Sequence, residues 1–511
     1  MEFTHQNVSY RTTWLILALC LPVTIACIDV MALSVAINDI MQDFAVSMNK
    51  AQWLLSGYTI GTAAFLILIG KLADVYGRRK LLLIGIIIFA LSSFTAAISN
   101  KIDFLLISRF IQGISSAMMM TTVISIITNN FPPEMRSSMI ARWGVSLGLG
   151  LAIGPLIGGL IIHLFNWRII FLVNIPICLM SYFLVTQFIE ESKDTISQSK
   201  INWLESILLT FLLLLLITAL SEGSYWGWLS QYTIILSISF LLLLFAFIFI
   251  ERKKKNPLID ISLFRNLNFC SATFCGFISY FCMYGWLFII GIYLQSAYSL
   301  TSLLTGVLCS SFSIAFAFTS KLLSKIIKNS ENKSLIQTGF VLSIIDFLWM
   351  TTITVSTQVW LLILMFFLLG ASIMLINAPS LAAATLETPS HKAGIASGII
   401  FTIRWLGGSI GVAIVALIFK FVSNDNFMKY LQTASNISSV KKNIILHELI
   451  NTNLQRLILP ENLSSHETGL LMMQIKSSLT EGLIFSCLFM VGLSLIGLIC
   501  SVGLKNKKTM A

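Results

Sequence analysis

Charge is what this sequence has least of. Only 11% of its 511 residues are Asp, Glu, Lys or Arg, 57% are hydrophobic, and the mean hydropathy is +0.89. A soluble globular chain is about 25% charged, so the composition excludes water as the main solvent. A bilayer core of about 30 Å takes roughly 20 apolar residues per helix, which leaves room here for a dozen or more spans. We therefore expect an all-α, multi-pass membrane protein.

Clustered metal ligands and catalytic side chains are also missing. The nine cysteines include no Cys-x-x-Cys pair, and the five histidines are widely scattered. His447-Glu448 lacks the second histidine of a His-Glu-x-x-His site. His163, near other polar groups at a helix end, is interpreted as an interfacial side chain rather than a ligand. We expect no disulfide, metal, cofactor or membrane-embedded enzyme.

The net charge of +11 comes from basic residues in short loops, not from one stripe or arm, so we expect no nucleic-acid partner. The loops expected inside hold most of the Lys and Arg, whereas the short outside loops hold little beyond Lys50, Lys101 and Arg168. The positive-inside rule then places both termini in the cytoplasm. We expect a protein of the bacterial cytoplasmic (inner) membrane.

Fourteen apolar runs bounded by charged or turn residues predict fourteen membrane helices. The first run is longer than a signal-peptide core and lacks a cleavage site, so we expect it to be retained. The runs fall near 12–33, 52–70, 81–99, 104–128, 139–162, 169–189, 203–221, 231–250, 269–294, 302–322, 335–354, 358–378, 394–419 and 480–503.

Two short internal sequence similarities indicate that the chain consists of two related halves. Gly70–Asp74 resembles Ser320–Ser324, and Arg142-Trp143-Gly144 resembles Arg404-Trp405-Leu406-Gly407. We expect a six-helix bundle over 1–190, two inserted helices with cytoplasmic linkers over 191–265, and a second six-helix bundle over 266–511. The polar stretch at about 422–478 is predicted to be an external loop with short helices.

The most specific string is Gly70-Lys71-Leu72-Ala73-Asp74-Val75-Tyr76-Gly77-Arg78-Arg79-Lys80, in a tight turn between two helices. Gly77 permits a positive φ, Asp74 can cap a helix or pair with an arginine, and the arginines can bind a helix C-terminus or an acid. An ordinary basic loop would explain the arginines, but not the glycines and the aspartate at these spacings. The string resembles the signature of the major facilitator superfamily, in which it is a conformational latch.

Arg109 lies among apolar residues of the fourth predicted helix. An arginine within a span costs several kcal/mol unless it is paired or faces water, so it is a functional candidate, with a snorkelling interfacial arginine as the alternative. Arg109, Gln112 and Gly113 resemble the superfamily's Arg-x-x-Gln-Gly motif, whose arginine is implicated in proton coupling.

Small residues recur every four positions in the fifth predicted helix, around a proline that frees a carbonyl. This pattern also fits a dimer face. It resembles the antiporter motif Gly-x-x-x-Gly-Pro-x-x-Gly-Gly, typical of exporters, which favours export over uptake. The residues are Gly150, Gly154, Pro155, Gly158 and Gly159.

The next string, from Trp167-Arg168 to Asn174-Ile175-Pro176, is similar to one in the fourteen-helix drug:proton antiporters, the multidrug exporters of the superfamily. Arg404 with Gly407-Gly408 also resembles a string of these antiporters. The first helix departs from the family, with Ser34 where asparagine is usual and Asn38 where proline is usual. The resemblance implies a major facilitator fold of fourteen helices, two pseudosymmetric bundles and two inserted helices.

Two acids lie within predicted spans. Asp29 is about 17 residues into the first helix, and Asp346 is about midway along the eleventh. A bare carboxylate there is costly, so each is a candidate for exchanging a proton against substrate, with Arg109. The alternative for each acid is a carboxylate satisfied by a neighbouring hydroxyl or arginine.

Together these features predict a proton-coupled antiporter that exports lipophilic or amphipathic drugs by alternating access, driven by the proton gradient without a cofactor. Its expected partners are small lipophilic or cationic substrates, protons and the lipid bilayer, and a periplasmic adaptor protein is a further hypothesis. Export of an endogenous metabolite such as a siderophore or antibiotic is an alternative. A non-transporting receptor or scaffold is another.

Overall fold

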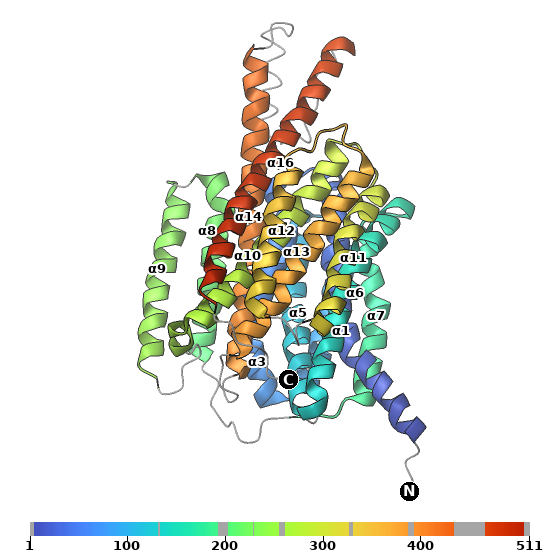
Figure 1. Ribbon diagram of the computed structural model, residues 1–511, viewed down its shortest axis with the longest axis vertical. Helices are drawn as coiled ribbons and strands as arrows, with labels where there is room; N and C mark the ends of the chain where they lie inside the picture. Colours follow the sequence, from blue (N-terminus) through green and yellow to red (C-terminus); the bar gives the residue numbers. More distant parts are fainter. Residues whose placement is uncertain are drawn as a thin grey trace.

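The computed structural model describes residues 5–130, 133–192, 203–227, 229–254, 261–326, 331–386, 393–433 and 465–504. All regular elements within these ranges are helical, and thirteen of the described helices are long and apolar enough to cross a membrane. The remaining expected span, 203–221, corresponds to a helix whose described apolar stretch, Ile207–Leu220, is shorter. The prediction of an all-α, multi-pass membrane protein is confirmed (Figure 1).

The N-terminal bundle consists of α1 and α3 to α7, and in it α1 packs on α6 and α7 while α5 packs on α3 and α4. A short helix, α2, follows α1. The bounds are α1 (His5–Asp43), α2 (Met48–Ala51), α3 (Trp53–Tyr76), α4 (Arg78–Ala97), α5 (Ile102–Asn130), α6 (Pro133–Leu164) and α7 (Arg168–Phe188).

The C-terminal bundle consists of α10 to α14 and α16, and in it α10 packs on α13, α14 and α16. The bounds are α10 (Leu267–Ser296), α11 (Ser302–Ile326), α12 (Asn332–Met350), α13 (Val359–Leu386), α14 (Ala393–Thr433) and α16 (Ser465–Val502).

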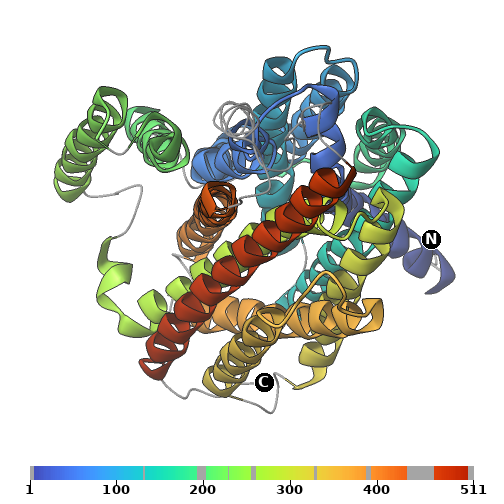
Figure 2. The same cartoon turned by 90° about the horizontal axis from the view of Figure 1, so that it is seen from above.

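Between the bundles in sequence lie α8 (Trp203–Trp226), α9 (Gln231–Arg252) and the short 3₁₀ helix η1 (Ile261–Arg265). The α8–α9 pair stands at one side of the molecule (Figure 2). α8 contacts α3 and α14, and it is joined to α3 by the hydrogen bond that the Trp53 indole donates to Glu222 and by the Thr210 hydroxyl, which donates to the Ala64 carbonyl over 3.1 Å.

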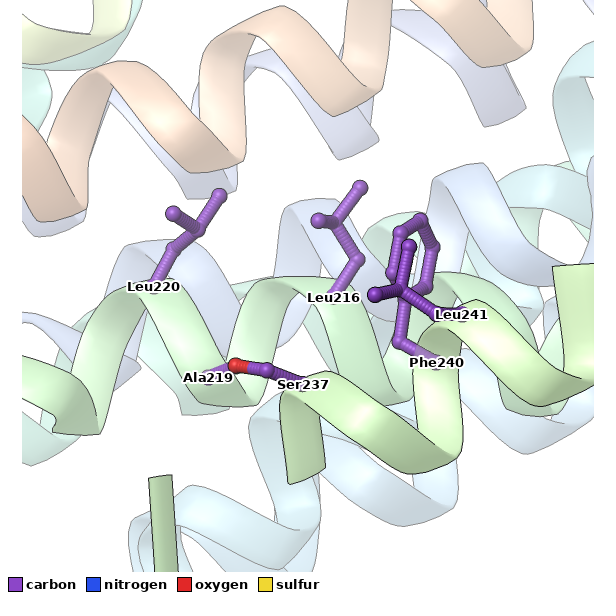
Figure 3. A pocket seen from close by; sticks show the side chains of 6 residues that line it. All are labelled: Leu216, Ala219, Leu220, Ser237, Phe240 and Leu241. Carbon is purple, nitrogen blue, oxygen red and sulfur yellow. The ribbon is translucent and has the colours of Figure 1, made fainter. Parts of the chain in front are cut away.

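α9 is almost entirely apolar but scarcely packed, with 11% of its most apolar segment buried, so its side chains suit contact with lipid. An apolar groove runs along the α8–α9 pair, and Leu216 and Leu220 of α8 point to the same side of it as Phe240 of α9 (Figure 3). Its lining residues are Leu216, Ala219, Leu220, Ser237, Phe240 and Leu241.

The polar stretch expected to be an external loop from about 422 to 478 is more helical than predicted. α14 continues to Thr433 and α16 already begins at Ser465, so each helix extends past its apolar segment into polar sequence. Both extensions project beyond the other helices in Figure 1. Residues 434–464, including the amphipathic run predicted at 443–459, lie outside the described residues.

The two bundles meet mainly where α6 packs on α11, α3 on α14 and α1 on α10. At the end of the molecule that carries Asp43, here called the Asp43 end, polar contacts tie them together. The Ser302 hydroxyl donates to Asp39 over 2.9 Å, the Gln295 amide donates to the Val35 carbonyl over 2.8 Å, and Lys420 donates to the Asn49 side chain over 3.2 Å. The bundles are therefore held closed at this end.

The glycines of α6 explain why this helix contacts both bundles. A Cβ at Gly154 would lie 2.5 Å from Met31 Cβ of α1, and one at Gly158 would lie 2.7 Å from the Ala32 backbone. On another face, a Cβ at Gly159 would lie 2.6 Å from the Ser302 carbonyl oxygen of α11. These faces are occupied within the monomer, so the structure does not leave them as a dimer face.

The Gly159→Leu variant is expected to lose about 1–3 kcal/mol of folding free energy, because the added side chain must push α11 away from α6. The matched control is Gly492→Leu in α16, where an added Cβ meets nothing within 4 Å. Equilibrium unfolding in mixed micelles measures both variants. Equal stability of the two would show that the α6–α11 contact tolerates side chains.

Candidate functional site

A buried ion pair lies in the middle of the N-terminal bundle. The guanidinium of Arg109 in α5 contacts the carboxylate of Asp29 in α1, and both side chains are 0% exposed. Since both are shielded from lipid as well as from water, Arg109 is not a snorkelling interfacial arginine. The pair brings together two residues that the sequence analysis singled out separately.

Neutral polar side chains also bind both members of this pair. Asn174 of α7 donates to the second Asp29 oxygen over 2.7 Å, and Gln112 of α5 accepts from Arg109 over 2.7 Å. Ser93 of α4 accepts from Gln112 over 2.7 Å and from Asn174 over 3.2 Å, which closes a ring of contacts. Four helices thus supply side chains to one polar centre.

A fifth helix, α3, binds the arginine through its backbone and an aromatic ring. The Nε of Arg109 donates to the Leu54 carbonyl over 3.1 Å, and its guanidinium carbon lies 4.6 Å from the centre of the Tyr58 ring. Gly113 allows α5 to approach α3 this closely, since a Cβ there would lie 2.2 Å from the Tyr58 carbonyl oxygen. Each residue of the predicted motif Arg109, Gln112, Gly113 therefore has a distinct structural role.

Trp167 and Arg168 bind at the Asp43 end of the same bundle. The Trp167 indole donates to Asp43 over 3.1 Å, and Arg168 donates to the same carboxylate oxygen over 2.7 Å. A second guanidinium nitrogen of Arg168 donates to the Ser99 carbonyl over 3.3 Å. The pair joins the ends of α1, α4 and α7, whereas Asn174, from the same sequence string, reaches the buried centre. Pro176 lies inside α7 just beyond Asn174.

The turn between α3 and α4 is capped by a residue that sequence reasoning missed. Gly77 has a φ of +112°, and the carboxylate of Glu191 accepts from the backbone N–H groups of Arg79 and Lys80, each over 3.0 Å. These N–H groups are free donors of the first turn of α4, to which an anion is favourable. Because Glu191 is 112 residues from Arg79, no local pattern indicated this contact.

The other residues of the latch motif are placed as follows. The Arg79 guanidinium donates to the Thr186 carbonyl over 2.6 Å, so it binds the C-terminal end of α7 as expected for an arginine at this position. Arg78 is buried, and its backbone N–H donates to the Ser192 carbonyl over 3.1 Å. Gly70 has open space around it, and the side chain of Asp74 lies outside the described residues.

The C-terminal bundle holds a second buried arginine, with different partners. Arg404 of α14 is 2% exposed and donates to the Asn377 side chain over 2.7 Å, to the Asn377 carbonyl over 2.9 Å and to the Ser380 hydroxyl over 2.7 Å. Within the described ranges it forms no ion pair with a carboxylate. Asn377 and Ser380 of α13 carry no recognised motif, so the sequence did not indicate them.

Asp346 does not join either arginine in this structure. It is fully buried in α12, which packs on α13 and α16, and neither carboxylate oxygen has a hydrogen-bond partner among the residues described. The structure thus brings Asp29 and Arg109 together and places Asp346 elsewhere. A coupling role for Asp346 stays a prediction.

With this geometry in hand, comparison with known proteins defines the family. The family model of the Major Facilitator Superfamily matches residues 19–412, which is more than half of the chain. The chain therefore belongs to the Major Facilitator Superfamily. It is a membrane transporter rather than an enzyme.

Curated relatives include drug-resistance proteins and a vitamin transporter. Multidrug resistance protein Stp of Mycobacterium tuberculosis is 29% identical over 389 residues, which cover 76% of this chain and 72% of that protein. Multidrug resistance protein 3 of Bacillus subtilis is 29% identical over 79% of this chain and 78% of its own. Riboflavin transporter RibZ of Clostridioides difficile is 25% identical over 80% of this chain and 89% of its own.

Among solved structures, a bacterial homologue of the human lysosomal transporter Spinster, in an inward-facing and unoccupied conformation, superposes with a TM-score of 0.65. The match covers 97% of both chains at 15% sequence identity. This likeness confirms the predicted major facilitator fold.

The buried ion pair is expected to dominate the stability of the N-terminal bundle. Asp29→Leu leaves a guanidinium that cannot lose its proton, and breaking such a pair costs about 3–5 kcal/mol. The double variant Asp29→Leu with Arg109→Met is expected to regain most of that loss. Denaturation in mixed micelles measures both.

The control is Asp103→Asn, which breaks the exposed Lys50–Asp103 ion pair and is expected to cost less than about 1 kcal/mol. If Asp29→Leu were no more destabilising than this control, the buried pair would not be a main stabilising contact.

Glu191→Ala is expected to loosen the first turn of α4, since removal of a helix cap costs about 1 kcal/mol. Hydrogen exchange of the Arg79 and Lys80 amides should then accelerate by about fivefold. Glu190→Ala is the control, because the bonds to these two amides come from Glu191. Unchanged exchange in Glu191→Ala would contradict the capping role.

Proposed function

We propose that this transporter is a proton-coupled antiporter that exports small lipophilic or amphipathic molecules across the cytoplasmic membrane by alternating access. The observation that supports it most directly is the fully buried Asp29–Arg109 pair, held by groups from α1, α3, α4, α5 and α7. A carboxylate enclosed in this way can bind a proton only when the surrounding helices open a path to it. Proton binding and opening are then linked.

The contacts of Arg109 suggest how protonation acts on the protein. When Asp29 accepts a proton, the ion pair becomes a contact between a neutral acid and a cation, so it weakens. Arg109 keeps its bonds to Gln112 and to the Leu54 carbonyl of α3. The positive charge is then shared more with α3, including the Tyr58 ring. α3 packs on α14 of the other bundle, so the proton site biases one of the contacts at which the bundles must separate.

The packing of α6 supports exchange between two arrangements of the bundles. Its antiporter motif contacts α1 on one face and α11 on another, so one helix belongs to the N-terminal bundle and carries a contact to the C-terminal bundle. The relatives whose names record multidrug resistance support drug export as the direction of transport.

The distribution of Lys and Arg supports an orientation with both termini in the cytoplasm, which makes the Asp43 end the external end. The bonds of Asp39, Val35 and Asn49 to the C-terminal bundle would then form a closed external gate. The membrane potential supplies about 2.3 kcal/mol per net charge per 100 mV, so entry of protons can drive accumulation of a substrate outside.

Export of an endogenous metabolite is the second candidate, and the riboflavin transporter among the relatives supports a metabolite as the substrate, since its name records one. The same proton site serves either substrate. The projecting ends of α14 and α16 are the place where a periplasmic adaptor would bind (Figure 1). Purification from crosslinked membranes without an envelope partner would count against the adaptor.

Substrate-dependent proton release from energised inverted vesicles tests the function. Wild type is expected to release protons when a transported lipophile is added, and Asp29→Asn is expected to show background flux because the amide cannot titrate. Asp346→Asn is measured beside it, because Asp346 is the other buried carboxylate that is a candidate for proton coupling.

Flux lost only in Asp346→Asn would move the coupling role to that residue. No flux with any lipophile or metabolite, together with unchanged drug tolerance of cells, would contradict proton-coupled export.

A further inference from the structure

The sites around the two buried arginines differ in net charge. Arg109 is neutralised by Asp29, whereas Arg404 contacts the neutral Asn377 and Ser380 and no carboxylate in the part of the chain described. The Nε of Arg404 has no hydrogen-bond partner there either. A buried guanidinium with neutral partners is a favourable place for an anionic group, because a carboxylate or sulfonate supplies the missing charge and acceptors.

Four aromatic rings lie between the two arginines, at the contact of the bundles. The ring centre of Trp405 in α14 lies 6.3 Å from that of Tyr58 in α3. It lies 5.8 Å and 5.6 Å from the ring centres of Tyr280 and Tyr284, which both belong to α10. The guanidinium of Arg109 is 4.6 Å from the Tyr58 ring and that of Arg404 is 5.9 Å from the Tyr280 ring. The four rings therefore form a continuous aromatic cluster with one arginine beside each end.

This cluster is closed in the present structure, with Tyr58 0% and Trp405 4% exposed. Because Tyr58 belongs to one bundle and Trp405 to the other, any separation of α3 from α14 parts these two rings. A planar molecule that enters there replaces one ring-to-ring contact with two. Flat aromatic faces bind other flat rings favourably in offset or edge-on geometry.

On the basis of the export function proposed above, we propose that the substrate is a planar aromatic anion, bound through its acidic group to Arg404 and through its ring to Trp405 and Tyr280. The uncompensated charge of Arg404 selects against aromatic cations, which would be repelled inside a poorly solvated site. An anion leaving the cell and a proton entering it both move charge in the direction that an inside-negative potential favours.

The test is direct binding of three probes with one ring system to the purified full chain in lipid nanodiscs. Anthracene carboxylate, its neutral hydroxymethyl analogue and its cationic aminomethyl analogue differ in charge at a single substituent. The wild type is expected to bind the carboxylate about tenfold or more tightly than either analogue, as measured by probe fluorescence.

Two substitutions address the arginine independently. Arg404→Gln removes the charge, and Gly276→Ala displaces it, because a Cβ at 276 would lie 2.6 Å from Arg404 Nε. Both are expected to weaken carboxylate binding by about tenfold while binding of the neutral analogue is unchanged. Arg404→Lys should restore part of the preference. The control is Lys429→Gln, which removes an exposed positive charge farther along α14.

Three results would overturn the proposal: tighter binding of the aminomethyl analogue, equal weakening of all three probes in Arg404→Gln and Gly276→Ala, or no binding of the carboxylate. Equal weakening would assign Arg404 a purely structural role. The binding assay needs no proton gradient, so the two proposals fail separately. Selective carboxylate binding without proton-coupled flux would refute antiport alone, and proton-coupled export of cations without carboxylate binding would refute the substrate class alone.

Discussion

The arrangement of the N-terminal bundle depends on one constraint, that the charge of Arg109 must be compensated away from water. A guanidinium presents five N–H groups and keeps its proton, so the protein has to supply acceptors around it. Nε and one terminal nitrogen bind a carboxylate from α1, an amide from the arginine's own helix α5 and a carbonyl from α3, whereas the other terminal nitrogen has no hydrogen-bond partner among the described residues. Asn174 and Ser93 in turn fix the carboxylate and the amide. The relative positions of five helices are thereby set at one point.

The two bundles differ in how they satisfy the same requirement. Arg109 is paired with the carboxylate of Asp29, whereas Arg404 donates hydrogen bonds to the neutral side chains of Asn377 and Ser380. In the two proposals made above, proton binding belongs to the N-terminal bundle and recognition of the substrate's charge to the C-terminal bundle, with the aromatic cluster between them. Asp346 lies outside this division, since α12 packs on α13 and α16.

The sequence predicted the helices and the family well, because apolar runs and glycine-rich turns are local signals. It also identified Asp29 and Arg109 individually, since a charge in an apolar run is conspicuous. It left open that an arginine satisfies Asp29, but it did not identify Arg109 as that arginine, and it did not indicate that Ser93, Tyr58 and Glu191 contact the motif residues. Those contacts join positions far apart in the chain, as between Asp29 and Asn174, and depend on how the helices pack. The polar extensions of α14 and α16 were missed because hydropathy marks only the apolar segment that crosses the bilayer, and not the full length of the helix.

The close approach of α6 to α11 has a consequence for how the bundles move. At Gly159 and Gly306 the surfaces that meet are backbone atoms, with Pro155 and Ser302 carbonyl oxygens directly under the two glycines. Helices that interlock large side chains resist displacement, since each knob must leave its hole before the next position is reached. A contact between backbone atoms, as at these two glycines, has no interlocked side chains to separate. At these two glycines, α6 and α11 can therefore slide past each other, so that one bundle can tilt against the other while the helices remain in van der Waals contact.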